Sequence, residues 1–121
     1  MKANQAKNTT RRTKIYRGSG NVFYDLGFSK REAAGLQVKA ELTRQIYNRI
    51  KEMRLTQIQA SERLGISQPD VSKLINAQFT GYSTDRLIAL LNSLEVDVEI
   101  VIRPRKTGRG RSHGIVRVRA A

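Results

Sequence analysis

The chain has 121 residues, no cysteine and a single histidine, and its 23 Lys or Arg against 10 Asp or Glu give a formal net charge of +13. That length suits one domain, and the lack of cysteine excludes a disulfide framework and a zinc finger. The lone His113 argues against histidine-based catalysis, and no apolar run is long enough for a signal sequence or a membrane span. We therefore expect a soluble cytoplasmic protein that is not an enzyme and holds no metal or cofactor.

The positive charge lies entirely at the two ends of the chain. Residues 18–102 hold ten Lys or Arg and ten Asp or Glu, so they are neutral, whereas residues 1–17 and 103–121 contain no acid. Such runs are typical of flexible arms that bind nucleic acid, although tails that only keep a protein soluble have the same composition. We thus expect a basic arm (1–17), a domain (18–102) and a basic tail (103–121). Their cations are Lys2, Lys7, Arg11, Arg12, Lys14 and Arg17 in the arm, and Arg103, Arg105, Lys106, Arg109, Arg111, Arg117 and Arg119 in the tail.

The first part of the domain predicts helix after a short extended stretch. Residues 22–24 are an extended signal within the glycine-bounded segment 18–27. Ser29 and Glu32 have the spacing of a capping box, which starts a helix that runs to about Arg54. Its apolar residues favour either one long amphipathic helix or two that separate at Gly35; they are Leu42, Ile46, Ile50 and Met53.

Residues 55–76, LTQIQASERLGISQPDVSKLIN, predict two short helices joined by a tight turn. Thr56 with Gln59 forms one capping box, and Ser67 with Asp70 forms the next, eleven residues later. Gly65 between them can adopt the positive φ that such a turn needs. This is the spacing of a helix-turn-helix, in which the second helix enters the major groove of DNA.

The second of these helices separates its side chains into two faces. Val71, Leu74 and Ile75 recur at helical spacing and should face inward. The opposite face is an uncharged-to-basic stripe that can hydrogen-bond to base edges, although most polar helix faces are simply solvated. The stripe consists of Gln68, Pro69, Ser72, Lys73 and Asn76.

A loop and a last helix follow. The loop turns around Gly81, and the hydroxyls of Thr80 and Tyr82 suit either phosphate contact or a packing role. Ser83 caps the last helix, whose apolar stripe completes a helical bundle; the stripe comprises Leu87, Ile88, Leu90, Leu91 and Leu94.

From Val96 onward the apolar period changes from 3.6 to 2, which predicts a strand over residues 96–102. A strand needs a partner, which can be the 22–24 stretch, residues 115–118, or the same strand of a second chain. Two-fold dimers are usual among helix-turn-helix proteins, so we favour a homodimer, with an intrachain hairpin as the alternative. The dimerisation residues are Val96, Val98, Ile100 and Ile102.

The tail holds one further, weaker motif. Arg109-Gly110-Arg111 resembles the core of an AT-hook, which lies in a narrow minor groove. The flanking prolines of an AT-hook are missing, so a generic basic linker is favoured.

The helix-turn-helix segment resembles the Xre family, the five-helix domains of phage lambda repressor and Cro. GSGNVFYDLG at residues 18–27 and FTGYSTDRLIALLNSLEVDVEIVIRP at residues 79–104 are similar to the subgroup that contains HigA-type antitoxins. The resemblance covers about residues 18–104. It implies that Gln57 and Asn76 contact phosphate and that Gln68 and Ser72 contact bases. Pro69 with Asp70 departs from the small or basic residues of many relatives.

Together these features predict a mainly α protein: a five-helix lambda-repressor-like bundle with a C-terminal β-strand and flexible basic tails. The expected function is sequence-specific repression, as a cytoplasmic, nucleoid-associated bacterial homodimer on a pseudo-palindromic operator. The resemblance favours a HigA-like antitoxin that binds a RelE-like toxin. The alternatives are a stand-alone or prophage regulator and an RNA-binding or nucleoid-coating protein. The expected DNA-binding residues are Thr56, Gln57, Ser67, Gln68, Pro69, Ser72, Lys73, Asn76, Thr80 and Tyr82.

Overall fold

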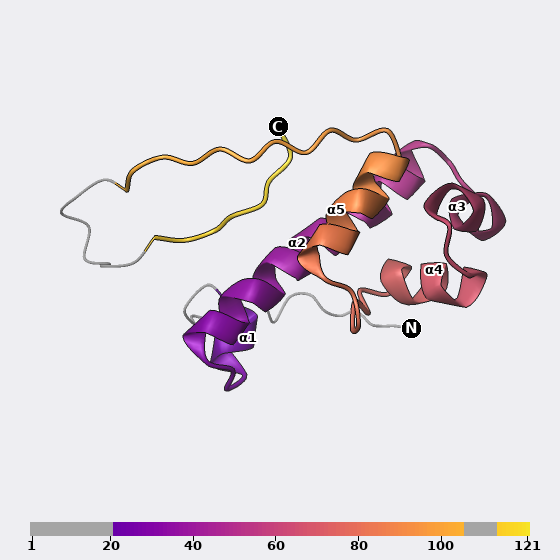
Figure 1. Ribbon diagram of the computed structural model, residues 1–121. Coiled ribbons are helices and arrows are strands. Elements are labelled where there is room, and N and C mark those ends of the chain that lie inside the picture. The colour runs from indigo at the N-terminus through magenta and orange to yellow at the C-terminus, as the bar shows by residue number, and fades with distance from the viewer. Residues whose placement is uncertain (1–20, 106–113) are drawn as a thin grey trace. The chain divides into compact units, whose positions relative to one another are not determined.

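The computed structural model describes residues 21–105 and 114–121, and the described part is helical with extended ends (Figure 1). The residues 1–17 of the basic arm, the Arg109-Gly110-Arg111 motif and His113 lie outside the described residues. The chain divides into two units, residues 1–34 and 35–121. The helices in chain order are α1 (Val22–Asp25), α2 (Lys30–Glu52), α3 (Gln57–Leu64), α4 (Gln68–Ile75) and α5 (Thr84–Ser93).

The extended stretch expected at residues 22–24 is wrong, because these residues form the short helix α1. Asn21 is the reason: its side-chain oxygen accepts hydrogen bonds from the backbone N–H groups of Phe23 and Tyr24, at 2.9 and 3.2 Å. Asn21 satisfies these two N–H donors locally, so Phe23 and Tyr24 do not need the hydrogen bonds of a partner strand. Because residues 22–24 are helical, they do not supply a partner strand for residues 96–102.

Helix α2 is one continuous helix, and Gly35 does not divide it. The Ser29–Glu32 capping box is confirmed, since each backbone N–H is bonded to the other side chain at 3.1 Å. Leu42, Ile46 and Ile50 are buried along one face of the helix, as their spacing predicts.

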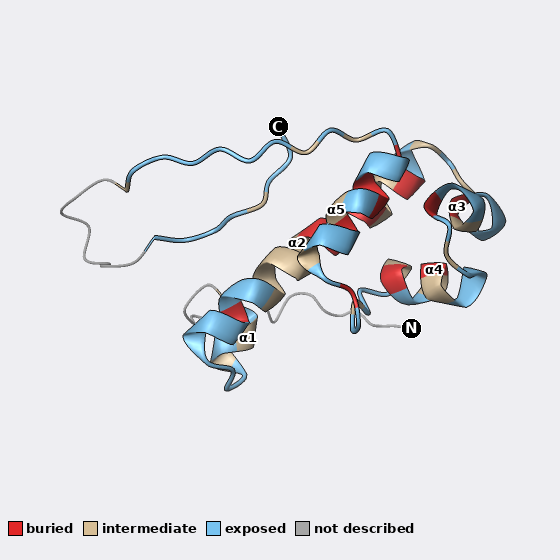
Figure 2. Cartoon of the chain, viewed as in Figure 1, coloured by how far each residue is buried: buried red, intermediate tan, exposed pale blue. Residues whose placement is uncertain are grey.

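The core of residues 35–121 lies between α2, α3, α4 and α5, and its buried residues are red in Figure 2. Helix α3 packs against both α4 and α5. Full burial of an aliphatic side chain stabilises a fold by roughly 1.5–3 kcal/mol, so this cluster holds the short helices together. Its members are Leu42, Ile46, Ile50, Ala60, Leu64, Val71, Leu74, Tyr82, Leu87, Leu90, Leu91 and Leu94.

The predicted strand at residues 96–102 is not formed in the described part of the chain. Residues 96–105 continue from α5 as extended chain without an assigned strand. Val96 and Val98 pack against the core, but the apolar residues that follow are exposed. Val118 also packs against this core, which was not expected of a flexible tail.

Candidate nucleic-acid interface

The first helix of the helix-turn-helix begins at a complete capping box. The backbone N–H of Thr56 donates to Gln59 Oε1 at 2.9 Å, and the N–H of Gln59 donates to Thr56 Oγ1 at 3.1 Å. Thr56 and Gln57 are both exposed at this helix start. Free backbone N–H groups and a helix N-terminus favour an anion, so this end of α3 is chemically suited to a phosphate.

The second helix begins at half of the expected capping box. The N–H of Asp70 donates to Ser67 Oγ at 3.2 Å. The return bond, from the Ser67 N–H to the Asp70 carboxylate, is not among the hydrogen bonds of the described residues. Aspartate is one methylene shorter than the Glu or Gln that a capping box normally uses, so it does not reach back.

The turn between α3 and α4 is fixed by Gly65 and Ser61. Gly65 has φ 69° and ψ 30°, the left-handed conformation that its sequence position predicted. Its N–H donates to the Ser61 carbonyl at 2.9 Å, and the Ser61 hydroxyl donates to the Ile66 carbonyl across the turn. The Ser61 hydroxyl bond thus helps to fix the angle at which α4 leaves α3.

The two faces of α4 are arranged as predicted. Val71 and Leu74 are buried, and Ile75 packs against the core. On the opposite side Gln68, Pro69, Lys73 and Asn76 are exposed, and Ser72 is half-buried. The structure thus brings the predicted polar stripe together on one face of α4.

Asn76 has part of its hydrogen-bonding capacity in use within the protein. Its Nδ2 donates to the Ser72 carbonyl at 2.9 Å, and the same carbonyl also accepts the backbone N–H of Asn76 at 3.1 Å. One amide hydrogen and the amide oxygen remain for other partners. The bond also holds the Asn76 side chain beside Ser72.

The structure favours the packing role for Tyr82 but not for Thr80. The Tyr82 ring belongs to the core and its residue is only 9% exposed, whereas Thr80 is exposed. The Arg86 guanidinium lies over the ring, 4.8 Å from its centroid. Burial raises the pKa of the Tyr82 hydroxyl above its ordinary value of 10.0; the Asp70 carboxylate raises the pKa further, and Arg86 opposes them. Tyr82 therefore supports the start of α5 from inside.

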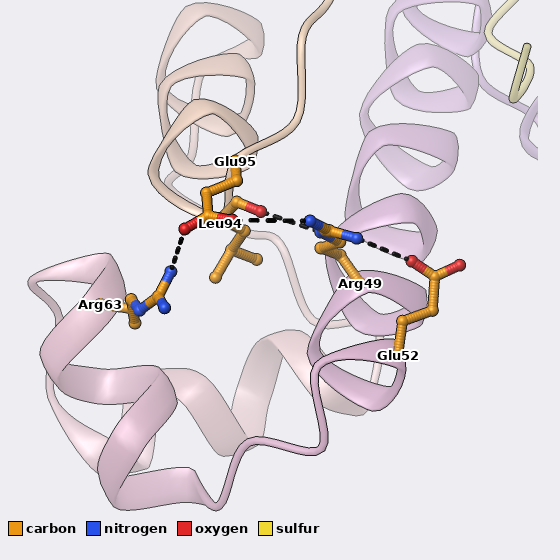
Figure 3. Close-up of polar contacts among 5 residues, drawn as sticks. All are labelled: Arg49, Glu52, Arg63, Leu94 and Glu95. Carbon is orange, nitrogen blue, oxygen red and sulfur yellow. Dashed lines mark hydrogen bonds and ion pairs between the residues drawn. The ribbon is translucent and has the colours of Figure 1, made fainter.

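An ion-pair network joins α3 to α2 and to the end of α5 (Figure 3). Arg49 on α2 donates through Nε to the Leu94 carbonyl at 2.9 Å and pairs with Glu52 at 3.2 Å. Glu95 then joins Arg49, at 4.0 Å, to Arg63 on α3, at 3.3 Å. Exposed ion pairs contribute little each, but the bond to Leu94 satisfies a carbonyl at the end of α5. Sequence spacing did not reveal the contacts made by Leu94 and Glu95, since their partners Arg49 and Arg63 lie far from them in the chain.

Neither a metal-binding cluster nor a membrane-spanning helix is found among the described residues. In residues 21–105 and 114–121 there is no group of three or more His, Cys, Asp or Glu that could hold a metal ion. Within the same residues, no helix is both long and apolar enough to cross a membrane.

Comparison with known proteins agrees with this geometry. A family model for a helix-turn-helix domain matches residues 22–103. A solved structure named as an XRE family transcriptional regulator is 44% identical and superposes with a TM-score of 0.66; the match covers 74% of this chain and 99% of that chain. A search of curated proteins gave no match. The chain belongs to the XRE-type helix-turn-helix family.

Proposed function

We propose that this protein is a cytoplasmic transcription repressor that recognises a specific operator through α4. The observation that carries the proposal is the polar stripe on the outer face of α4, which the turn at Ser61 and Gly65 holds beside α3. A helix presented in this way fits the major groove, where amide side chains pair with adenine and lysine with guanine.

The proposed contacts divide into base readers and phosphate binders. Gln68 and Ser72 read bases, with Pro69 and Lys73 beside them. The positioning residues contact phosphates and fix the register of α4 in the groove. They are Thr56, Gln57, Ser67, Asn76 and Thr80, all exposed; the buried Tyr82 supports them from the core.

Replacement of Gln68 by alanine tests base reading. We expect a loss of about 1–3 kcal/mol on the selected operator and a much smaller loss on random duplex, because a base contact is removed and the phosphate contacts stay. Gln57→Ala is the matched control, since it makes the same change on α3 and should weaken both duplexes alike. Titration of each variant on both duplexes gives the two ratios. Equal losses for Gln68→Ala on both duplexes would refute base reading by this residue.

The repressor acts as a homodimer in this proposal, with residues 96–102 as the dimerisation segment. Ile100 and Ile102 are 76% and 91% exposed in the single chain, so these two side chains of the expected strand are not covered by the described residues. A second copy would cover these side chains and set the spacing of two recognition helices on a pseudo-palindrome.

The biological role we propose is that of a HigA-like antitoxin, which rests on the resemblance of residues 18–27 and 79–104 to that subgroup. A RelE-like toxin encoded beside this gene should co-purify with the full chain and lose its toxicity when the two are co-expressed. A Gln68→Ala variant should neutralise the toxin equally well, because α4 is assigned to DNA. Failure to bind or neutralise such a toxin would instead favour a stand-alone or prophage regulator.

A further inference from the structure

Two extended segments near the C-terminus expose an unusual amount of apolar surface. They are residues 96–102 and residues 115–119, and they are mostly pale blue in Figure 2. Five large aliphatic side chains on them are more than half exposed: Ile100, Val101, Ile102, Ile115 and Val116. Such surface on two neighbouring stretches of β-branched residues is typical of strands that await a partner.

The backbone of both segments is also unpaired. Val96 still exchanges hydrogen bonds with the end of α5. Beyond it, no backbone hydrogen bond joins residues 97–105 or 114–121 to another described residue. A hairpin within one chain is a local structure that a single copy could form, yet the single chain holds both segments extended and unpaired.

The two segments are complementary in charge. Asp97 and Glu99 alternate with the apolar residues of the first segment, and Arg117 and Arg119 alternate with those of the second. All four side chains are exposed, and none of them belongs to an ion pair recorded among the described residues. Opposite charges directly across two strands stabilise their pairing, whereas like charges destabilise it.

One antiparallel register satisfies every position at once. With Glu99 opposite Arg117, Asp97 falls opposite Arg119 on the same face, because residues alternate between faces. The other face then pairs Val98 with Val118. In the single chain both valines pack against the core, and in an exchanged ladder Val118 would take the same place against the core of the other copy. If residues 96–102 of one copy paired with residues 96–102 of the other, their acidic side chains would approach one another. Residues 115–119, which carry the arginines, would then have no partner strand.

We propose that the dimer interface is a pair of exchanged β-ladders, in which residues 96–102 of each copy pair with residues 115–119 of the other. The inference rests on the proposed dimerisation and adds the identity of the partner segment; it does not depend on operator recognition. A consequence is that Arg117 and Arg119 serve assembly rather than DNA binding.

A charge exchange between two separately purified full-length variants tests the proposal. In a dimer of the Glu99→Arg variant the new arginine faces Arg117 of the other copy, and in a dimer of the Arg117→Glu variant the new glutamate faces Glu99. Both ladders of either dimer therefore contain a like-charge pair. Each variant should dimerise about tenfold more weakly than the wild type in sedimentation. Mixed together, the two should recover wild-type dimerisation, because each ladder of the mixed dimer again holds one arginine and one glutamate. The out-of-register mixture of Glu99→Arg with Arg119→Glu should stay weak.

The possible failures are distinguishable. Variants that dimerise as tightly as the wild type would overturn the exchanged ladders while leaving dimerisation itself in place. A mixture that is not restored, beside a restored Glu99→Arg/Arg117→Glu double variant, would mean that the segments pair within one chain. A wild-type protein that is monomeric would remove both the ladders and the proposed dimer.

Cross-linking gives a second test that leaves the charges and the core unchanged. The chain has no cysteine, and Val101 and Ile115 are both exposed and opposite each other in the proposed register. Oxidation of a mixture of Val101→Cys and Ile115→Cys proteins should give a covalent heterodimer as the main product. The mixture of Val101→Cys with Val116→Cys, one residue out of register, should not. Equal yields from both mixtures would overturn the register.

Discussion

Replacement of nine cations at the ends of the chain by glutamine should flatten the salt dependence of DNA binding by several units in log K against log salt. Each phosphate neutralised by Lys or Arg contributes about 0.9 to that slope, so nine lost contacts could lower the affinity by more than roughly 10³-fold. Substitution by glutamine is preferable to deletion, because Val118 packs against the core and the end of the tail is part of the fold. The nine cations are Lys2, Lys7, Arg11, Arg12, Lys14, Arg17, Lys106, Arg109 and Arg111.

The control for this experiment removes cations from the neutral domain. Arg31, Arg44 and Lys51 are exposed on α2, and their change to glutamine should leave the slope nearly unchanged. The preferred operator should be the same for all these proteins, because the tails are assigned affinity and α4 specificity. An unchanged slope in the variant with all nine substitutions would mean that these cations do not contact DNA. A changed sequence preference would instead favour minor-groove contact by Arg109 and Arg111.

Proline at Ile100 should separate the dimer while the helices remain folded. Proline has no backbone N–H and cannot donate to a ladder, and Ile100 lies outside the core. A monomer keeps one recognition helix but loses the second half-site and the effective concentration of a linked pair. Operator affinity should therefore fall by about 10²- to 10⁴-fold.

Sedimentation and helical circular dichroism measure the two parts of this expectation. Ile100→Val is the matched control, because it keeps the β-branched side chain and the backbone donor; it should remain dimeric. If Ile100→Pro stays dimeric, the interface lies elsewhere on the chain. If the wild type is monomeric at micromolar concentration, the two-fold operator model is wrong.

Local signals in the sequence predicted the helix starts and the turn of the motif. Ser29, Thr56, Ser67 and Ser83 each cap a helix as expected, because a cap depends on residues within one turn. Gly65 likewise adopts the positive φ that its position requires. The face of α4 followed from apolar spacing alone.

Features that depend on less usual local choices were not predicted. Asn21 caps α1 where the sequence suggested a short extended stretch. Two residues after the ends of α2, α4 and α5, the chain takes a positive φ at residues that are not glycine, so the usual signal for a helix end is missing. These residues are Arg54, Ala77 and Glu95.

Long-range contacts were also beyond sequence reasoning. The bond from Arg49 to the Leu94 carbonyl joins residues 45 positions apart, and spacing along the chain cannot indicate such a pair. The burial of Tyr82 depends on how α5 packs against the rest of the core, so its hydroxyl could not be assigned in advance. The strand at residues 96–102 stays a prediction, because the proposed partner segment belongs to a second copy of the chain.

The ratio of affinities for a selected operator and for random duplex tests the central claim most directly. Random-sequence duplexes should be selected on the wild-type protein at a fixed salt concentration, and the winning sequence titrated beside an unselected one. A repressor that reads bases through α4 should bind the selected duplex at least ~10³ times more tightly, with two half-sites about one helical turn apart. A ratio near one would contradict the account, and would mean that the basic ends coat nucleic acid while the helix-turn-helix reads no sequence.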